Sequence, residues 1–133
     1  MSGVGGASPK GESRKLVLVV DDDPQIRTLV ARALSPAYSV KEASDGLVAA
    51  EALATPPLPD LIILDIMMPN ADGITFASAM KANADYRHLP IIFLTARSSP
   101  GDVIQGIRLG ARAYLTKPFK LEDLRAKVAK VLG

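Results

Sequence analysis

Short apolar segments alternate with helical segments five times along this chain, and this alternation limits the possible folds more than any other feature. The apolar segments cover residues 16–20, 38–42, 60–64, 89–94 and 113–116. Their length suits strands, and short connections rich in Pro, Asp and Gly separate them from the helical stretches. Alternating strands and helices are typical of a parallel sheet covered by helices on both faces. The sequence therefore predicts an α/β fold.

The helical stretches carry start and stop signals. Asp23 is expected to cap a helix that starts at Pro24 and ends near Ser35. Further helices are expected over residues 45–54, from about residue 72, over residues 99–110, and from about residue 121. Glycine weakens a helix by about 1 kcal/mol relative to alanine. Because the fourth helix contains Gly106, we expect it to be the least rigid.

Composition limits the class of protein. The 133 residues make one domain, in which residues 1–14, rich in Gly and Ser, form a flexible tail and residues 15–133 the folded part. The absence of cysteine excludes disulfides and thiolate metal sites, and it suits a reducing cytoplasm. No apolar run reaches the ~20 residues of a membrane span. We therefore expect a soluble cytoplasmic domain without membrane insertion.

Charge is unevenly distributed along the chain. The net charge of +2 is too small to suggest nucleic-acid binding. Residues 21–65 carry eight acidic and three basic side chains, whereas residues 97–133 carry eight basic and three acidic ones. This pattern predicts an acidic pocket and a basic surface. The basic surface is more often the solvated face of amphipathic helices than a docking patch for an acidic partner, and both interpretations stay open.

Polar residues stand where four of the apolar segments end. Asp21 and Asp22 follow the first segment, Asp65 the third, Thr95 the fourth, and Lys117 follows the fifth. The carboxyl ends of parallel strands gather at one edge, where such sheets bind ligands. Adjacent buried carboxylates are costly unless a cation or a proton compensates them. Oxygen ligands without nearby His or Cys favour Mg²⁺.

This combination also suits phosphoryl transfer. Two carboxylates can hold a metal, a third can attack, and a cation with a hydroxyl can bind phosphoryl oxygens. Asp65 is the candidate nucleophile, which would form an acyl phosphate. Each residue also has a purely structural interpretation, since acids at strand ends often form turns, and Asp23 before Pro24 is expected to do only that. The agreement of four strand ends favours the functional interpretation.

Four motifs resemble the receiver domain of bacterial two-component response regulators. They are VVDDDP, LDIMMPNADG, LTA and YLTKPF, and the resemblance covers residues 15–132. It implies a flavodoxin-like, doubly wound (βα)5 fold whose five-stranded parallel sheet has the strand order 2-1-3-4-5. It also implies a phosphorylation-activated signalling protein rather than an enzyme, with a sensor histidine kinase or a histidine phosphotransfer protein as its partner.

The resemblance assigns a role to each residue of the acidic pocket. Asp65 would be the phosphoacceptor. Asp22, Asp65 and the backbone carbonyl of Met67 would bind Mg²⁺ directly, and Asp21 would bind it through water.

The remaining motif positions would bind and report the phosphoryl group. Lys117, Thr95 and the backbone of Ala96 would contact phosphoryl oxygens. Thr95 and Tyr114 would form a switch pair, in which Thr95 moves toward the phosphoryl group and the Tyr114 ring enters the vacated space. The alternative for Tyr114 is a half-buried strand aromatic. The bond before Pro118 is expected to be cis.

Two further positions follow from the resemblance or depart from it. Gly73 is expected to relieve a tight turn after Asp72. Met67 is apolar and poor at orienting a hydrolytic water, so we expect a phosphoryl lifetime longer than in chemotaxis-type receivers.

The expected output surface also departs from the family. Receivers that dimerise through the face of helix four, strand five and helix five often carry an acidic pair where Arg112 and Ala113 stand here. We expect a monomer or a weak phosphorylation-dependent dimer, with a downstream protein target on that face. The basic side chains of Arg108 and Arg112 would favour a partner different from the one bound by receivers that carry the acidic pair.

Four alternatives remain. The chain could be the receiver of a longer regulator or a hybrid kinase. A Mg²⁺-dependent aspartyl-nucleophile phosphatase would need a general acid where Met67 stands, and a cap domain. A flavodoxin-like cofactor binder would need a phosphate-binding loop after the first strand, where the acidic VVDDDP segment would repel phosphate unless a metal were present. A pseudo-receiver usually lacks one of the site residues, and none is missing here.

Overall fold

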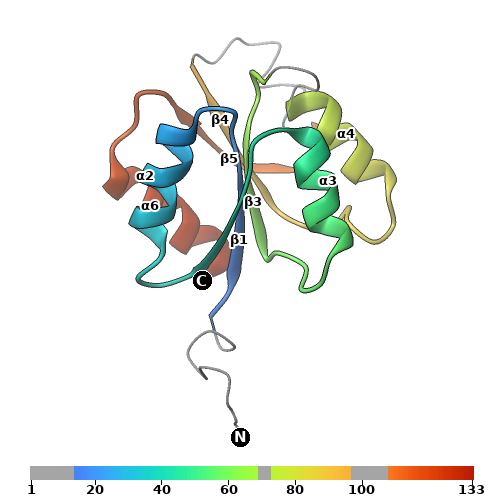
Figure 1. Cartoon of the computed structure of the whole chain (residues 1–133), viewed down its shortest axis with the longest axis horizontal. Coiled ribbons are helices and arrows are strands. Elements are labelled where there is room, and N and C mark those ends of the chain that lie inside the picture. Colours follow the sequence, from blue (N-terminus) through green and yellow to red (C-terminus); the bar gives the residue numbers. More distant parts are fainter. Residues whose placement is uncertain (1–13, 69–72, 97–107) are drawn as a thin grey trace, which may run out of the picture.

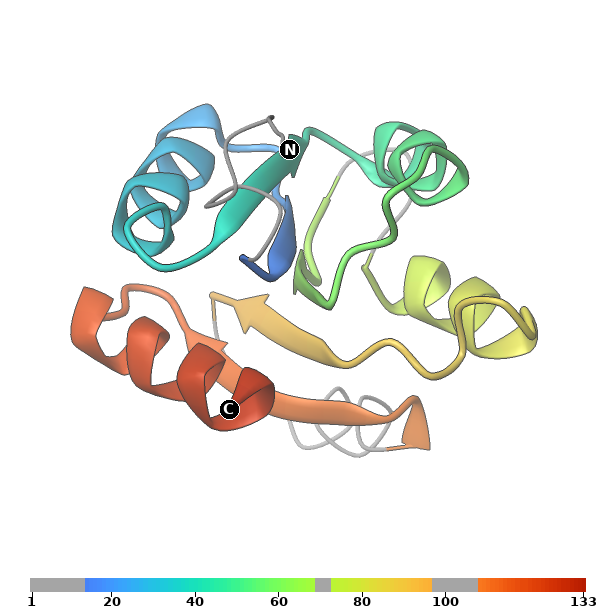
Figure 2. The same ribbon diagram turned by 90° about the horizontal axis from the view of Figure 1, so that it is seen from below.

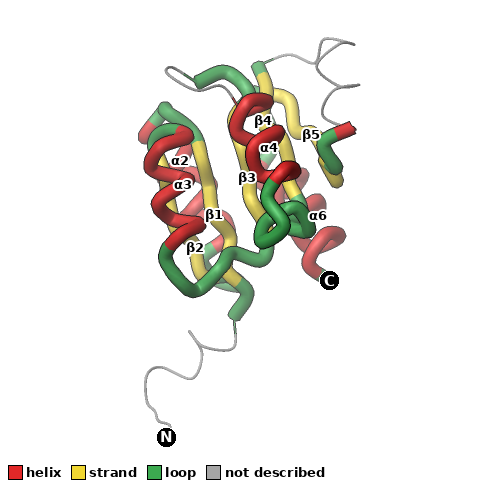
Figure 3. Tube along the Cα trace, turned by 90° about the vertical axis from the view of Figure 1, so that its right-hand side faces the viewer, coloured by secondary structure: helices red, strands yellow, loops and turns green. Residues whose placement is uncertain are grey.

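A five-stranded parallel sheet forms the centre of the protein (Figure 1). The computed structural model describes residues 14–68, 73–96 and 108–133. The strands are β1 (Leu16–Val20), β2 (Ser39–Ala43), β3 (Leu61–Asp65), β4 (Ile91–Thr95) and β5 (Ala111–Thr116). They lie in the order β2-β1-β3-β4-β5, and all neighbouring pairs are parallel (Figure 3). The predicted flavodoxin-like fold and strand order are confirmed.

Helices cover both faces of this sheet. They are α2 (Pro24–Leu34), α3 (Gly46–Ala54), α4 (Gly73–Ala82) and α6 (Leu121–Leu132). In Figure 1, α2 and α6 lie on one side of the sheet, and α3 and α4 lie on the other. None of the helices in the described part of the chain is long and apolar enough to cross a membrane.

The sheet separates two hydrophobic cores. Leu18 and Val20 of β1 pack in the core on the α3 and α4 side, whereas Val17 and Val19 pack in the core on the α2 and α6 side. The same alternation holds in β3 and β4. Because side chains alternate between the faces of a strand, a strand covered on both faces must be apolar throughout. This explains the continuous apolar runs of the three central strands.

Two aspartates cap the helices that follow β1 and β2. The side chain of Asp23 accepts a hydrogen bond from the backbone N–H of Gln25, and that of Asp45 accepts one from Val48. Each bond satisfies a backbone donor that has no partner within its helix. The predicted cap at Asp23 is confirmed, and α2 ends before Ser35 as expected.

Several strand boundaries differ from the predicted ones. The fourth strand begins at Ile91 instead of residue 89, because Leu89 is buried outside the ladder and Pro90 has no N–H to donate to it. The second strand is shifted by one residue, and the fifth begins two residues earlier than predicted. Asp65 and Thr95 are the last residues of their strands rather than the first residues beyond them.

Other expectations fall outside the described residues. These are the tail over residues 1–13, the turn at Asp72, and most of the predicted fourth helix with Gly106. Gly110, where that helix was expected to end, has a φ of 84°, directly before β5. Residues with side chains rarely adopt this conformation, so a glycine is favoured there.

Candidate metal and phosphoryl site

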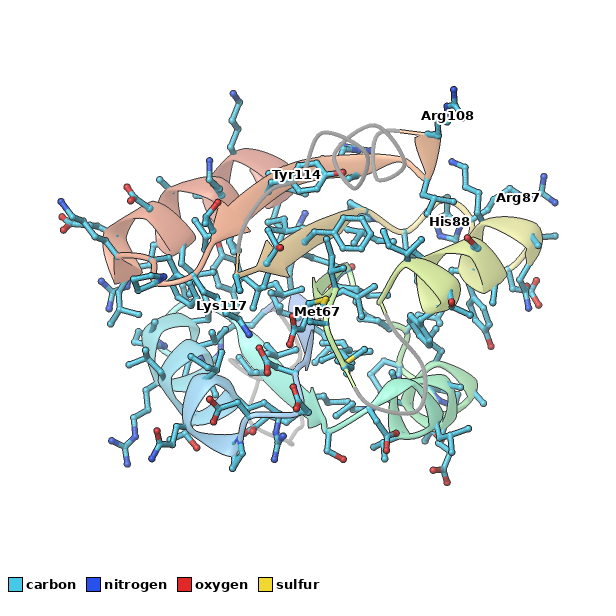
Figure 4. All side chains as sticks on the ribbon, turned by 90° about the horizontal axis from the view of Figure 1, so that it is seen from above. Met67, Arg87, His88, Arg108, Tyr114 and Lys117 are labelled. Atoms are coloured by element: carbon cyan, nitrogen blue, oxygen red, sulfur yellow. The ribbon has the colours of Figure 1, made fainter. Side chains whose placement is uncertain are left out.

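The carboxyl edge of the sheet gathers the polar positions that the sequence singled out. Asp21 follows β1, Asp65 and Thr95 end β3 and β4, and Lys117 follows β5. These four strands are consecutive neighbours in the sheet, so their ends lie side by side. Figure 4 looks onto this edge, with Lys117 and Met67 near the middle of the view.

Three carboxylates meet at this edge. Asp21, Asp22 and Asp65 each offer one oxygen, and these oxygens lie within 4.8 Å of one another. Asp21 is 0% exposed and Asp65 2%, whereas Asp22 is exposed. Burying like charges this close together costs free energy unless a cation or a proton compensates them. The acidic pocket that the charge distribution predicts is therefore present.

Lys117 supplies a positive charge to this pocket. Its Nζ lies 2.8 Å from Asp21 Oδ2 and 3.2 Å from Asp65 Oδ2. Burial alone would lower the pKa of Lys117, but its interactions with Asp21 and then Asp65 raise it above the usual value. One ammonium group, brought by the loop after β5, thus neutralises charge at the ends of β1 and β3.

Asp65 holds a proton more tightly than an ordinary carboxylate. Burial and then the charge of Asp21 raise its pKa from 3.8 to about 6. Lys117 lowers this pKa, and so does the backbone N–H of Met67, which donates to Asp65 Oδ1 at 3.1 Å. A pKa of about 6 still leaves Asp65 mostly ionised at neutral pH, so its carboxylate adds negative charge to the pocket beside Lys117.

The donor set fits a hard divalent cation such as Mg²⁺. It consists of carboxylate oxygens, which Mg²⁺ prefers, and the chain has no cysteine. The only histidine, His88, is exposed and lies away from Lys117 and Met67 (Figure 4). Asp22 is exposed, so waters bound to a metal beside it would face solvent. The ligand roles of Asp22, Asp65 and the Met67 carbonyl, and the water-mediated role of Asp21, remain predictions.

Arg27 fixes the acidic turn after β1, a role that the sequence analysis missed. Its Nη1 donates to the backbone carbonyl of Asp21 at 2.6 Å, and its Nε lies 3.3 Å from Glu42 Oε1 on β2. The backbone N–H of Asp23 donates to Asp21 Oδ1 at 2.9 Å. These contacts hold Asp21 from both sides. The sequence signal for this role is spacing, because Arg27 stands one helical turn after the N-cap Asp23 and can therefore reach the turn before the helix.

Gly73 meets a close-packing requirement, whereas the tight turn expected after Asp72 lies outside the described residues and stays a prediction. A Cβ at this position would lie 2.3 Å from the backbone carbonyl oxygen of Asp65. The Gly73 N–H donates to the carbonyl of Ile66 at 2.9 Å. The start of α4 therefore packs directly on the backbone of Asp65, and only glycine leaves room for it.

The two residues of the expected switch pair lie on adjacent strands. Thr95, 3% exposed, pairs in register with Thr116, and Phe93 pairs with Tyr114. The half-buried ring of Tyr114 stacks on Phe93, with 5.7 Å between ring centroids. Alternate residues of a strand share a face, so Phe93 and Thr95 lie on the same side of β4. The ring of Tyr114 thus packs two residues below the level of Thr95 along the sheet.

Pro118 and Ala96, the two remaining positions that the resemblance singled out, lie at the same edge. The Lys117–Pro118 peptide bond is cis. The Pro56–Pro57 bond is also cis, for which the sequence analysis gave no expectation. Ala96 is exposed directly after β4. Its proposed backbone contact with a phosphoryl group remains a prediction.

The family pattern of the response regulator receiver domain matches residues 17–129, which is most of the chain. The chain belongs to this family. Receiver domains are the phosphorylated signalling modules of two-component systems, and they work together with histidine kinases. The acidic pocket found here is where members of the family bind Mg²⁺.

Similar proteins place receiver domains in several settings. The DNA-binding dual master transcriptional regulator RpaA of Synechocystis is 42% identical over 117 residues, which are 87% of this chain and 48% of RpaA. The structure of chemotaxis protein CheY4 of Vibrio cholerae has a TM-score of 0.83 at 35% identity, covering 90% of this chain and 99% of CheY4. The receiver domain of a histidine kinase from Syntrophus aciditrophicus has a TM-score of 0.79 at 33% identity, covering 89% of each chain. The chain spans about half the length of the curated relatives it matches.

In metal-free buffer, we expect Asp65→Asn to increase the free energy of unfolding at neutral pH. The pKa of Asp65 in the folded state, about 6, exceeds its usual 3.8, so folding favours the protonated carboxyl. The stability from this group is fully present below the usual pKa and is lost as the pH rises through about 6. The difference in free energy of unfolding between the variant and the unaltered domain should therefore rise by about 1–3 kcal/mol from acidic to neutral pH. Urea unfolding in the presence of EDTA measures this difference.

An exposed carboxylate provides the control. Asp85→Asn should show no such pH-dependent gain, because Asp85 is exposed. Adding Mg²⁺ should stabilise the unaltered domain and leave Asp65→Asn almost unaffected. A constant difference between Asp65→Asn and the unaltered domain across this pH range would contradict the prediction.

We expect Gly73→Ala to destabilise the domain by about 1–3 kcal/mol, although alanine normally favours a helix. The added methyl group would overlap the carbonyl of Asp65, so α4 or the end of β3 must move. Chemical denaturation measures the loss, with Ser78→Ala on the exposed side of α4 as the control. Equal stability of the two variants would show that α4 starts farther from Asp65.

Proposed function

We propose that this receiver domain accepts a phosphoryl group on Asp65 from the phosphohistidine of a histidine kinase or a histidine phosphotransfer protein. The supporting observation is the position of Asp65, a carboxylate buried between Asp21 and Lys117 at the ligand-binding edge of the sheet. Membership of the receiver family supports the donor. The domain would signal through changed protein contacts and, without catalytic turnover on a substrate, would not act as an enzyme.

Nucleophilic attack by Asp65 accounts for the transfer. One carboxylate oxygen would attack the phosphorus atom, a P–O bond would form, and the P–N bond would break with its electron pair staying on the imidazole nitrogen. Bound Mg²⁺ would supply charge compensation for the carboxylates and the phosphoryl oxygens. Asp65, with a pKa of about 6, is largely ionised at neutral pH and so ready to attack.

Lys117 and Thr95 would hold the transferred group. Lys117 already lies 3.2 Å from an Asp65 oxygen, so its ammonium group can pair with phosphoryl oxygens bonded to that carboxylate. The hydroxyl of Thr95 and the backbone of Ala96 follow at the end of β4. Movement of Thr95 toward the phosphoryl group would free space for the Tyr114 ring and change the surface near β5.

The setting of the domain in the cell is also part of this proposal. We place it in the cytoplasm, as a monomer or a weak phosphorylation-dependent dimer, with a downstream protein target on the face that includes β5 and α6. CheY4 and RpaA illustrate a chemotaxis protein and a transcriptional regulator with this domain. A single-domain protein and the receiver of a longer regulator or hybrid kinase both agree with the proposed chemistry. No observation favours a phosphatase, because the exposed side chain two residues after Asp65 is Met67.

Incubation with acetyl phosphate and Mg²⁺ should increase the intact mass by one phosphoryl group. EDTA should prevent the increase, because the carboxylates then repel the incoming phosphoryl oxygens. Asp65→Asn should show no increase, and Asp85→Asn should match the unaltered domain. Modification of Asp65→Asn to the same extent would place the phosphoryl group elsewhere and exclude the proposed phosphoacceptor.

We expect Met67→Asn to shorten the lifetime of the phosphoryl group. Met67 is 69% exposed beside Asp65, and its thioether orients water poorly, whereas an amide can hold a hydrolytic water near the phosphorus atom. The decay rate after removal of the donor should rise by about tenfold, below the ~10²–10⁴-fold of full general base catalysis. Met67→Leu is the control and should keep the original rate. Equal rates for Met67→Asn and Met67→Leu would rule out this explanation.

A further inference from the structure

Arg27 supports the acidic turn after β1 but has no part in the proposed phosphoryl chemistry. It lies on α2, which packs beside the edge strand β2 (Figure 2). Its Nη1 donates to the carbonyl of Asp21, and its Nε pairs with Glu42 of β2. The Arg27 side chain is 17% exposed and that of Glu42 is 42% exposed. Because a partly exposed ion pair adds little to stability, stability alone does not account for this arrangement.

The carbonyl that Arg27 holds belongs to the peptide bond between Asp21 and Asp22. A peptide unit is planar, so a fixed carbonyl also fixes the direction of the Asp22 N–H and the position of its Cα. The next peptide unit is held as well, because the N–H of Asp23 donates to Asp21 Oδ1 at 2.9 Å. Both peptide units that flank Asp22 are thus fixed, one of them by Arg27.

The side chain of Asp22 depends on this backbone for its position. It is exposed, and within the described residues it takes part in no hydrogen bond or ion pair. One of its oxygens nevertheless lies within 4.8 Å of oxygens of Asp21 and Asp65. Groups that orient metal ligands matter for affinity, and their removal typically weakens metal binding by about 10–100-fold. Arg27 is therefore placed to influence a metal that it does not contact.

Strand β2 anchors the same turn at two consecutive residues. The N–H of Asp21 donates to the carbonyl of Ala43 at 3.1 Å, and the preceding residue, Glu42, pairs with Arg27. Ala43 thus holds Asp21 directly, and Glu42 holds it through Arg27. The carboxylate of Glu42 also offsets the charge of the guanidinium group, which would otherwise repel a cation in the pocket. The pair can position the turn with little electrostatic cost to metal binding.

We propose that Arg27, oriented by Glu42, is a positioning residue that sets how tightly the site binds Mg²⁺. It acts through the peptide unit between Asp21 and Asp22 rather than by contact with the metal. Its effect is on the affinity for Mg²⁺, whereas the attack by Asp65 is unchanged once the metal is bound. The proposal rests on the proposed function, because it requires that the acidic pocket binds Mg²⁺.

Two other roles for Arg27 would give different results. If Arg27 acted only through its charge, its removal would strengthen Mg²⁺ binding, because a cation near the pocket repels another cation. If Arg27 served the fold alone, its removal would lower the free energy of unfolding and leave the Mg²⁺ affinity of the folded domain unchanged. The sign and the size of the change in Kd therefore distinguish the three roles.

Addition of MgCl₂ to the unphosphorylated domain at constant ionic strength tests the proposal without phosphoryl transfer. Amide chemical shifts in NMR spectra give the Kd, and urea unfolding with EDTA confirms that each variant is folded under these conditions. Arg27→Gln should weaken Mg²⁺ binding by about tenfold, although it removes a positive charge. Arg27→Lys keeps the charge but replaces two nitrogens of a rigid fork by one ammonium group, so it should weaken binding by about threefold.

Arg32→Gln is the matched control for charge. Arg32 is exposed in the last turn of α2, at the end of the helix far from the acidic turn. The variant removes the same charge from the same helix, and its Kd should stay within about twofold of that of the unaltered domain.

Two variants of Glu42 isolate its contact with Arg27. Glu42→Gln and Glu42→Ala remove the same charge, but only glutamine keeps a side-chain oxygen that can accept a hydrogen bond from Arg27. Glu42→Ala should therefore bind Mg²⁺ about threefold more weakly than Glu42→Gln. Equal Kd values for these two variants would show that Glu42 does not orient Arg27.

Three results would overturn the role of Arg27. Tighter Mg²⁺ binding by Arg27→Gln would indicate that Arg27 acts through its charge. A Kd within about twofold of the unaltered domain, in a variant of lower stability, would indicate that it serves the fold alone. Equal weakening by Arg27→Gln and Arg32→Gln would indicate an effect that is not specific to the acidic turn.

Phosphorylation by acetyl phosphate separates this proposal from the proposed function. In Arg27→Gln, the Mg²⁺ concentration for half the maximal rate should rise by about tenfold, while the rate at saturating Mg²⁺ stays within about twofold. A lower rate at saturation with an unchanged half-saturating concentration would overturn the positioning role. Absence of Mg²⁺ binding by the unaltered domain would reject the metal site and the proposed function with it. Equal Mg²⁺ binding and phosphorylation in Arg27→Gln would reject only the role of Arg27.

Discussion

The ammonium group of Lys117 is the interaction on which the candidate site depends, because it compensates two buried carboxylates from different strands. Its Nζ contacts Asp21 and Asp65, while its backbone N–H donates to the carbonyl of Thr95 at 2.7 Å. One residue thus connects the ends of β1, β3 and β4 with the loop that follows β5. Removing the lysine would leave two adjacent buried carboxylates without compensation, which typically costs about 3–5 kcal/mol, so the edge of the sheet is organised around it.

Much of the fold could be predicted from the sequence because its strongest signal, the continuous apolar run of each central strand, is also the physical cause of the architecture. Strands covered on both faces must be apolar throughout, and β1, β3 and β4 show this directly. Strand ends were predicted less well. Leu89 continues an apolar run and is buried, yet it lies outside β4, since burial and ladder hydrogen bonding are different requirements.

The composition of the candidate site could also be predicted, but its supporting contacts could not. Asp21, Asp65 and Lys117 stand at strand ends, where topology alone brings them together. Arg27 and Gly73 act through the backbone carbonyls of Asp21 and Asp65. Such contacts depend on where main-chain atoms lie in space, which local patterns do not encode. A β-bulge in β5 is a further case: Ala111 and Ala113 pair with consecutive residues of β4, so Arg112 between them has no partner, and this becomes visible only when the two strands are aligned.

The shared position of Tyr114 has a thermodynamic consequence that reaches back to Asp65. Its ring stacks on Phe93 in the core and also lines a surface groove between β5 and α6, so a movement of the ring would change both regions. Linkage is reciprocal: a ligand that prefers the phosphorylated form must stabilise that form by the same free energy with which phosphorylation strengthens its binding. The downstream target proposed for the face of β5 and α6 would then do more than detect the phosphoryl group. Its concentration would help to determine what fraction of the domain is phosphorylated whenever the donor and the domain are close to equilibrium.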